Sequence, residues 1–163
     1  MRIAVAMAGL ILATAPGAAL AQLPGAVTTR PIPDDGAWTI ATVANGGCFA
    51  RNPGAQVDTI VMVNAQSKLV VSGGHRDWDL GETAIQVALQ VDGGVKHPMT
   101  VHPIGPIFLV VIDDPAIASQ VEGAHTLTWT LPNGVVTGEV TGLDKAFQVA
   151  TACGLAAAKA AAQ

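Results

Sequence analysis

A short polar segment of this sequence, Gly73-Gly74-His75-Arg76-Asp77-Trp78-Asp79, carries the side chains best suited to chemistry. Alternate residues of an extended chain point to one side, so His75, Asp77 and Asp79 could present an imidazole and two carboxylates to the same ion. Zinc sites in proteins use three or four such nitrogen and oxygen ligands. The segment is therefore a candidate metal site.

Two further histidines could complete that site. His97 and His102 are each followed directly by a proline, and both could reach the segment across a sheet. The sequence contains neither a His-Glu-x-x-His motif nor the spacing of a calcium loop. The alternative interpretation is a solvated loop, in which Trp78 fills part of the core and Arg76 pairs with a neighbouring aspartate.

No other pattern indicates an active site or a cofactor. Asp113 and Asp114 are adjacent carboxylates, but the proline that follows them makes Asp114 a helix N-cap rather than a catalytic acid. None of the serines stands in a Gly-x-Ser-x-Gly elbow, and the paired glycines fit neither the Walker A nor the Rossmann pattern. The sequence consequently favours a non-catalytic protein without a cofactor.

The first 21 residues have the three parts of a secretory signal peptide. Arg2 supplies the positive charge, residues 3–15 form an uncharged apolar run, and the small side chains of Ala19 and Ala21 suit cleavage between Ala21 and Gln22. The apolar run is shorter than the roughly 20 residues of a membrane-spanning helix. A cleaved signal is therefore expected, which predicts a periplasmic or secreted protein with no membrane span after the signal is removed.

The only two cysteines are Cys48 and Cys153. In an oxidising compartment an even number of cysteines favours a disulfide. Two buried thiols and a reactive thiol are the alternatives, but the sequence has no Cys-x-x-Cys motif. A Cys48–Cys153 bridge would join the last helix to an early strand.

Composition limits the partners of this protein. The chain has 163 residues, of which 12% are charged, and its net charge is −4. This length fits one domain. Nucleic-acid binding needs clustered lysines and arginines, and the sequence has no such cluster. Another envelope or secreted protein remains as the expected kind of partner, and the sequence does not determine the oligomeric state.

Two segments alternate clearly between apolar and polar residues, 85–92 and 125–131. Each predicts a strand with one buried and one solvated face, as in antiparallel sheets. The second segment places His125 on its apolar side, as a core or edge histidine. The continuous apolar run 106–112 predicts a central strand. Further strands are expected at residues 38–43, 57–63, 68–71, 95–101 and 135–140. Exposed edges of such sheets leave recognition by strand addition open.

Two helices are expected beside these strands. Asp114 and the following proline begin a short helix that runs to about residue 121. Thr141 and Asp144 fit a capping box at the start of an alanine-rich terminal helix. The fold class is therefore mainly β: an antiparallel β-sandwich or curled sheet with one short helix and a C-terminal helix docked by the disulfide. Its parts are a signal peptide (1–21), an extended Pro/Gly-rich leader (22–37) and one β-rich domain (38–163).

The order of several features resembles a group of small uncharacterised exported proteins of Gram-negative bacteria. These features are a Trp-led strand followed by a cysteine, a Trp-x-Leu turn before an alternating strand that ends in Asp-Gly, a hairpin, and a closing helix with the second cysteine. They occur here at Trp38, Cys48, Trp78-Asp79-Leu80, Val91-Asp92-Gly93, residues 127–140, Gly142-Leu143 and Cys153. The chain is also loosely similar to the invasion-associated locus B type of periplasmic protein. The resemblance implies a fold and a compartment, and no catalytic residues.

The sequence thus predicts an exported non-catalytic protein-interaction or accessory module of the cell envelope. The alternative is a small metal-binding protein or metal-dependent hydrolase that uses His75, Asp77 and Asp79.

Overall fold

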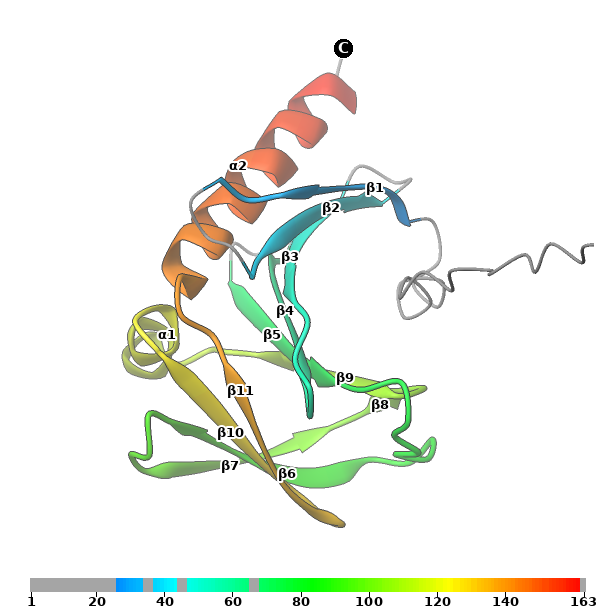
Figure 1. Cartoon of the computed structure of the whole chain (residues 1–163), viewed down its shortest axis with the longest axis vertical. Coiled ribbons are helices and arrows are strands. Elements are labelled where there is room, and N and C mark those ends of the chain that lie inside the picture. The colour runs from blue at the N-terminus through cyan, green and yellow to red at the C-terminus, as the bar shows by residue number, and fades with distance from the viewer. Residues whose placement is uncertain (1–25, 34–36, 44–46, 65–67, 162–163) are drawn as a thin grey trace, which may run out of the picture.

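The computed structural model describes residues 26–33, 37–43, 47–64 and 68–161, which form two antiparallel sheets and two helices (Figure 1). The predicted signal peptide and its predicted cleavage site at Ala21–Gln22 lie outside the described residues. The strands are β1 Ala26–Pro31, β2 Thr39–Val43, β3 Cys48–Asn52, β4 Asp58–Val63, β5 Leu69–Gly74, β6 Ile85–Val91, β7 Lys96–Val101, β8 Pro103–Ile104, β9 Ile107–Val111, β10 Thr126–Leu131 and β11 Gly134–Glu139. The helices are α1 Pro115–Glu122 and α2 Leu143–Ala161.

The larger sheet has seven strands in the order β1-β2-β3-β4-β5-β9-β8. It curls, so that β1 and β2 lie above β3 while β9 and β8 lie across the middle of the molecule (Figure 1). All five of its first strands pair with their sequence neighbours, and β5 pairs with β9 after the chain has passed through the other sheet. The curled arrangement confirms the predicted fold class.

The smaller sheet has four strands in the order β11-β10-β6-β7. The predicted alternation holds here: Val87, Leu89 and Val91 of β6 are buried, as are Leu127 and Trp129 of β10. These side chains pack against the seven-stranded sheet and form the main core with residues from both sheets and α2. Each strand of the smaller sheet therefore has its second face directed away from the core.

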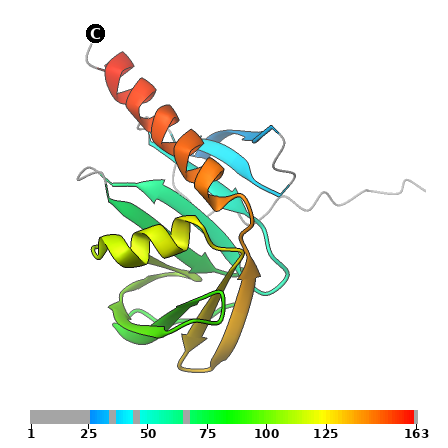
Figure 2. The same ribbon diagram turned by 90° about the vertical axis from the view of Figure 1, so that its left-hand side faces the viewer.

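Helix α1 begins as the sequence predicts. The Asp114 carboxylate accepts a hydrogen bond from the Ala116 N–H at 2.8 Å, and Pro115 follows the cap directly. This N-cap satisfies one of the backbone donors that the first turn leaves unpaired. Both helices lie on one side of the molecule, with α2 crossing the seven-stranded sheet diagonally (Figure 2).

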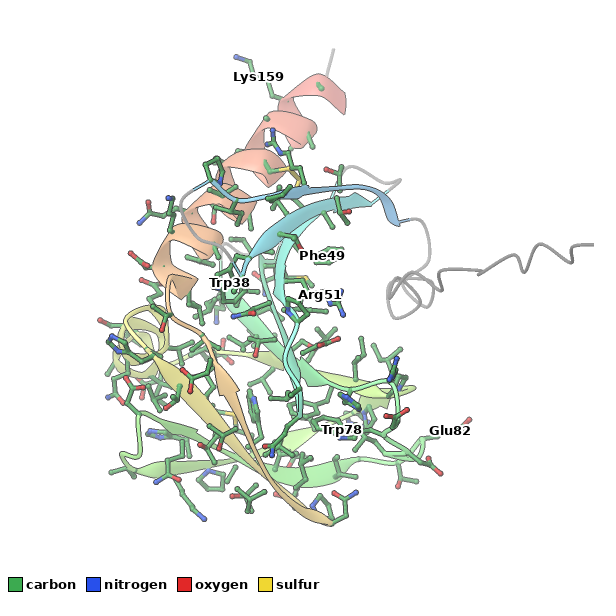
Figure 3. All side chains as sticks on the ribbon, in the orientation of Figure 1. Trp38, Phe49, Arg51, Trp78, Glu82 and Lys159 are labelled. Atoms are coloured by element: carbon green, nitrogen blue, oxygen red, sulfur yellow. A yellow bond between two sulfur atoms is a disulfide. The ribbon has the colours of Figure 1, made fainter. Side chains whose placement is uncertain are left out.

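Helix α2 is fixed to the seven-stranded sheet by packing and by a covalent bond. Leu143, Ala146 and Ala150 are almost completely buried on the face of β2, β3 and β4 that they cover. Cys153, one turn beyond Ala150, forms the predicted disulfide with Cys48 at the start of β3, with 5.8 Å between the two Cα atoms. Beyond Cys153 the helix projects past the sheet, and Lys159 lies near the projecting end (Figure 3).

Two local details differ from the sequence prediction. Residues 26–31, which lie in the segment expected to be a leader, form β1 and pair with β2. Helix α2 begins at Leu143, one residue later than a Thr141 cap requires. The Gly142 carbonyl accepts the bond from the Ala146 N–H, and Gly142 adopts a φ of 81°, a conformation that glycine takes at little cost.

Two buried tryptophans anchor the core. The Trp38 indole N–H donates to the Thr141 carbonyl at 2.9 Å, which ties the chain before β2 to the segment before α2. Trp129 meets Phe108 edge-on, with ring centroids 4.9 Å apart. A Cβ on Gly73 would lie 2.7 Å from the Phe108 ring, so glycine is required where these rings approach the backbone of β5.

Candidate functional site

The segment proposed as a metal site forms a turn between β5 and β6. The His75 carbonyl accepts from the Trp78 N–H at 2.9 Å, and the Asp79 carboxylate accepts from the Gly81 N–H at 3.2 Å. The Asp77 carboxylate lies 3.6 Å from the His75 Nδ1, which in turn accepts from the Asp77 N–H. These contacts stabilise the turn. The Asp77 carboxylate lies beside His75, whereas the Asp79 carboxylate binds the backbone at Gly81.

Trp78 and Arg76 follow the alternative interpretation of this segment. Trp78 is half-buried and stacks on Phe108, with an angle of 3° between the ring planes and 6.3 Å between the centroids. Arg76 makes an exposed ion pair with Asp77 at 3.7 Å. Figure 3 places Trp78 at the end of the sandwich, close to the β5–β6 connection. The prediction of a solvated loop closed by a core tryptophan is confirmed.

The two other candidate ligands lie elsewhere. His97 is half-buried on β7, opposite Leu89 of β6, and His102 is exposed in the link between β7 and β8. Within the residues that the structure describes, which include all five candidates, no three His, Cys, Asp or Glu side chains are placed to hold a metal ion. The fold therefore does not gather His75, Asp77, Asp79, His97 and His102 into one site.

The remaining titratable candidates are held in structural contacts. Asp113 pairs with Lys68 at the surface. The His125 side chain is 76% exposed, so the prediction of a core or edge position for it is wrong. The strand begins one residue later, at Thr126, and the His125 N–H is bound by Asp92 at 3.0 Å.

The acidity of Asp92 is perturbed by its surroundings. Hydrogen bonds lower the pKa of its carboxyl, the strongest coming from the Thr126 backbone N–H at 2.7 Å. The His125 N–H and the Thr126 hydroxyl add to this effect, and the His125 imidazole contributes a smaller Coulombic attraction. The carboxylate closes the β6–β7 turn onto the start of β10, which is a structural role.

The sheet edges are poorly suited to strand addition. Pro98 lies in the middle of β7 and has no N–H, and β8 is only two residues long and begins with Pro103. On β11 two outward backbone groups are already bound: the Gln56 side-chain Oε1 accepts from the Thr137 N–H at 3.4 Å, and the Asn52 side-chain amide donates to the Glu139 backbone carbonyl at 2.8 Å.

The remaining edge, β1, is restricted as well. The Ile32 N–H donates to the Trp38 carbonyl at 3.0 Å, and bonded pairs alternate along an antiparallel ladder. Thr29 and Pro31 therefore turn their backbone groups away from β2, and Pro31 offers no donor. The register of β1 is also irregular near its start. All four edges limit pairing with another strand, so contacts through the faces of the sheets are favoured.

The outward face of the seven-stranded sheet carries a second small apolar cluster. Ala41, Phe49 and Ile60 are buried there, and Met62 packs against them. Phe49 lies on the side of β3 away from α2 (Figure 3). On the same face Arg51 and Asp58 form a partly buried ion pair at 2.5 Å. These side chains are already enclosed, so the cluster contributes to stability and offers little free surface.

The outward face of the four-stranded sheet is different, because its side chains are exposed or half-buried and nearly all are uncharged. Two rows run across all four strands from β11 to β7, and we call this surface the threonine face. The first row is Thr137, Thr128, Gln90 and Lys96, and the second is Val135, Thr130, Ala88 and Pro98. Glu139 and Thr126 stand before the first row, and Gln86 and Thr100 after the second.

Local hydrogen bonds order the threonine face. The Thr128 and Thr137 hydroxyls are 2.9 Å apart, and the Gln86 amide donates to the Thr100 hydroxyl at 2.7 Å. Sequence reasoning recognised the polar side of β6 and β10 but not this surface, because its rows depend on the register of four strands. The Thr-x-Thr-x-Thr pattern at 126–130 was the available local signal.

Together these features define a class of structure: a disulfide-linked sandwich of two antiparallel sheets, with edges that limit strand addition and a terminal helix that covers one side. The crystal structure of invasion associated protein B from Bartonella henselae has the same fold. The match covers 76% of this chain and 96% of that chain, with a TM-score of 0.56 and 17% sequence identity. It confirms, at the level of the fold, the resemblance drawn from the sequence. No family model matches the chain, and no curated protein matches it.

Proposed function

We propose that this protein is an exported, non-catalytic interaction module of the bacterial cell envelope. The observation that carries the proposal is the shared fold with invasion associated protein B, which includes 96% of that chain.

Two features of this chain support the proposal, and a separate finding concerns its helices. The Cys48–Cys153 disulfide is typical of proteins that mature in an oxidising compartment. The candidate ligands His75, Asp77 and Asp79 serve a turn and are not combined with other ligands. No helix among the described residues has the length and apolar character needed to cross a membrane.

The compartment can be tested directly in a Gram-negative host. We expect the chain expressed from Met1 to be recovered from the periplasm or the medium, with an N-terminal peptide that begins at Gln22. Recovery of the uncleaved chain from the cytoplasm would contradict an exported role.

The interaction itself is best tested by crosslinking in the periplasm, followed by reconstitution with the purified partner. The control is the same chain after reduction and alkylation, because loss of the disulfide disturbs α2 while the amino-acid sequence stays the same. We expect a partner that binds the oxidised chain reversibly and in the presence of a chelator. Stoichiometric metal in protein purified without added metal, together with binding or activity that a chelator abolishes, would overturn the proposal.

A further inference from the structure

We propose that the threonine face binds a second copy of this chain and forms a weak face-to-face dimer. The threonine face is not covered by helix α1 or α2. A dimer through this face does not require that the protein also binds another envelope protein. Three features support this dimer: the exposure of the face, the match of its rows under two-fold symmetry, and the position of its two charges.

The threonine face is exposed in spite of its apolar content. Val135 is 60% exposed, and Pro98 beside it in the same row is also exposed. Between them stand half-buried Thr130 and Ala88, and the Thr130 hydroxyl is buried, so the row is mainly apolar. An apolar row flanked on both sides by threonine and glutamine resembles a small interface patch with a polar rim.

This row fits itself under two-fold symmetry. In a closed dimer the same patch is used twice, so each residue must meet a suitable one on the other copy. If the two-fold axis runs along the strands between the two faces, β11 lies over β7 of the other copy and β10 over β6. Val135 then faces the partner's Pro98, and Thr130 faces the partner's Ala88. The apolar row packs on itself.

The two charges of the face fit the same arrangement. Lys96 stands on one edge strand and Glu139 on the other, one row apart. Under the same symmetry Lys96 of each copy reaches the partner's Glu139, and the contact occurs twice. Neither side chain makes an ion pair elsewhere in the described ranges. Aligned sheets cross at about 30°, an offset that these two long side chains can span.

Asp92 and His125 also lie at this end of the sheet and bear on the charge balance. The Asp92 carboxylate is bound by the Thr126 backbone N–H and hydroxyl and by the His125 N–H, so its hydrogen-bonding capacity is largely used within the chain. It therefore does not compete with Glu139 for the lysine of the other copy.

The area of the face predicts a weak dimer. Four strands spaced by about 4.8 Å, with about 6.8 Å between rows, give a surface on the order of 500 Å² for each copy. A total of about 1,000 Å² lies at the lower limit for a specific interface. The dimer is therefore expected to dissociate on dilution, and its equilibrium is sensitive to single charge changes.

The experiment is sedimentation equilibrium of the mature, oxidised chain over a concentration range that reaches about 1 mM. The variants are Lys96→Glu, Glu139→Lys and the combined exchange of both. Each single reversal replaces two attractive contacts by two repulsive ones, so we expect the dimer dissociation constant to rise about tenfold. The combined variant, which restores opposite charges across the interface, is expected to dimerise like the original chain.

Lys159→Glu is the matched control, because it makes the same charge change at the far end of α2 and should leave the equilibrium unchanged. A chain that stays monomeric over the whole range would overturn the proposal. So would a dimer that the single reversals do not weaken, or one that the combined exchange does not restore. Partner capture by a strictly monomeric chain would support the proposed function and still exclude this dimer, so the two failures can be told apart.

Discussion

Removal of the disulfide is the perturbation whose effect can be worked out most fully from this structure. Cys48 and Cys153 are 105 residues apart in sequence, so the bond closes a long loop in the unfolded chain. In the chain-entropy description a loop of this size stabilises the folded state by about 4.7 kcal/mol. We therefore expect the variant Cys48→Ala/Cys153→Ala to lose about 4–5 kcal/mol of unfolding free energy, and its melting temperature to fall by roughly 10–20 °C.

The folded contacts of α2 indicate how this loss is distributed. Leu143, Ala146 and Ala150 keep the first half of the helix docked without the bond, since they are buried before Cys153 is reached. The second half has no comparable anchor, and exposed Leu155 follows Cys153 closely. We expect the global stability to fall and the last turns of α2 to exchange their amide hydrogens fastest.

Denaturant unfolding followed by tryptophan fluorescence measures the effect, because Trp38 and Trp129 are buried in the folded chain. The reduced original chain is the control, since it keeps both sulfur atoms and lacks only the bond. It should lose a similar free energy. A loss below about 1 kcal/mol in both proteins would refute the entropic reasoning, as would two free thiols in the denatured, unreduced protein.

Two further predictions concern single residues. Gly73→Ala places a Cβ 2.7 Å from the Phe108 ring, and we expect it to cost about 1–3 kcal/mol in urea unfolding, whereas Gly154→Ala, which meets no atom within 4 Å, should not destabilise the protein. If both changes alter the free energy of unfolding equally, contact with the Phe108 ring does not destabilise the Gly73→Ala variant. The folded-state pKa of Asp92 is lowered, mainly by the hydrogen bond from the Thr126 N–H. The ionised carboxylate therefore stabilises the folded state at a pH above its unfolded pKa near 3.8. This stabilisation is lost as the pH falls through the folded-state pKa. Asp92→Asn should therefore flatten the acid side of the stability profile below about pH 4, measured as urea midpoints from pH 5 downward; an unchanged profile would contradict this role for the carboxylate.

The four-stranded sheet was predictable from sequence because one of its faces is buried and the other solvated. Alternation then marks each strand directly, as in residues 85–92 and 125–131. Alternation predicts the first and last residues of such a strand less accurately. His125 continues the alternation in the sequence, but Asp92 binds its N–H and leaves the side chain outside the core.

The seven-stranded sheet was harder to predict because several of its strands are buried on both faces. Every residue of β5 is buried, and in β3 only Arg51 is not. Alternation disappears in such strands, and a continuous apolar run does not reveal which residues face α2 and which form the Phe49 cluster. The two-residue strand β8 has no local signal at all, since it depends on pairing with β9.

The candidate metal site failed for a similar reason. Spacing can place His75, Asp77 and Asp79 on one side of an extended chain, but this segment is a turn, and its backbone N–H groups bind the histidine and one of the carboxylates. Short-range hydrogen bonds of this kind compete with ligation and cannot be read from residue types. The disulfide was predicted correctly because two cysteines allow only one intramolecular pairing, and the predicted oxidising compartment favours its formation.

The sheet edges and the outward cluster around Phe49 leave little free surface for contact with another protein. Proline and bound backbone groups limit pairing at the edges, and the outward cluster around Phe49 is already enclosed within the chain. The threonine face has neither restriction, because Val135 and Pro98 reach solvent and the charges of Lys96 and Glu139 are not used internally. A surface that is ordered by its own hydrogen bonds loses little conformational entropy on binding. Among the described sheet faces, the threonine face is therefore the best suited to contact, because it is accessible and carries few charges.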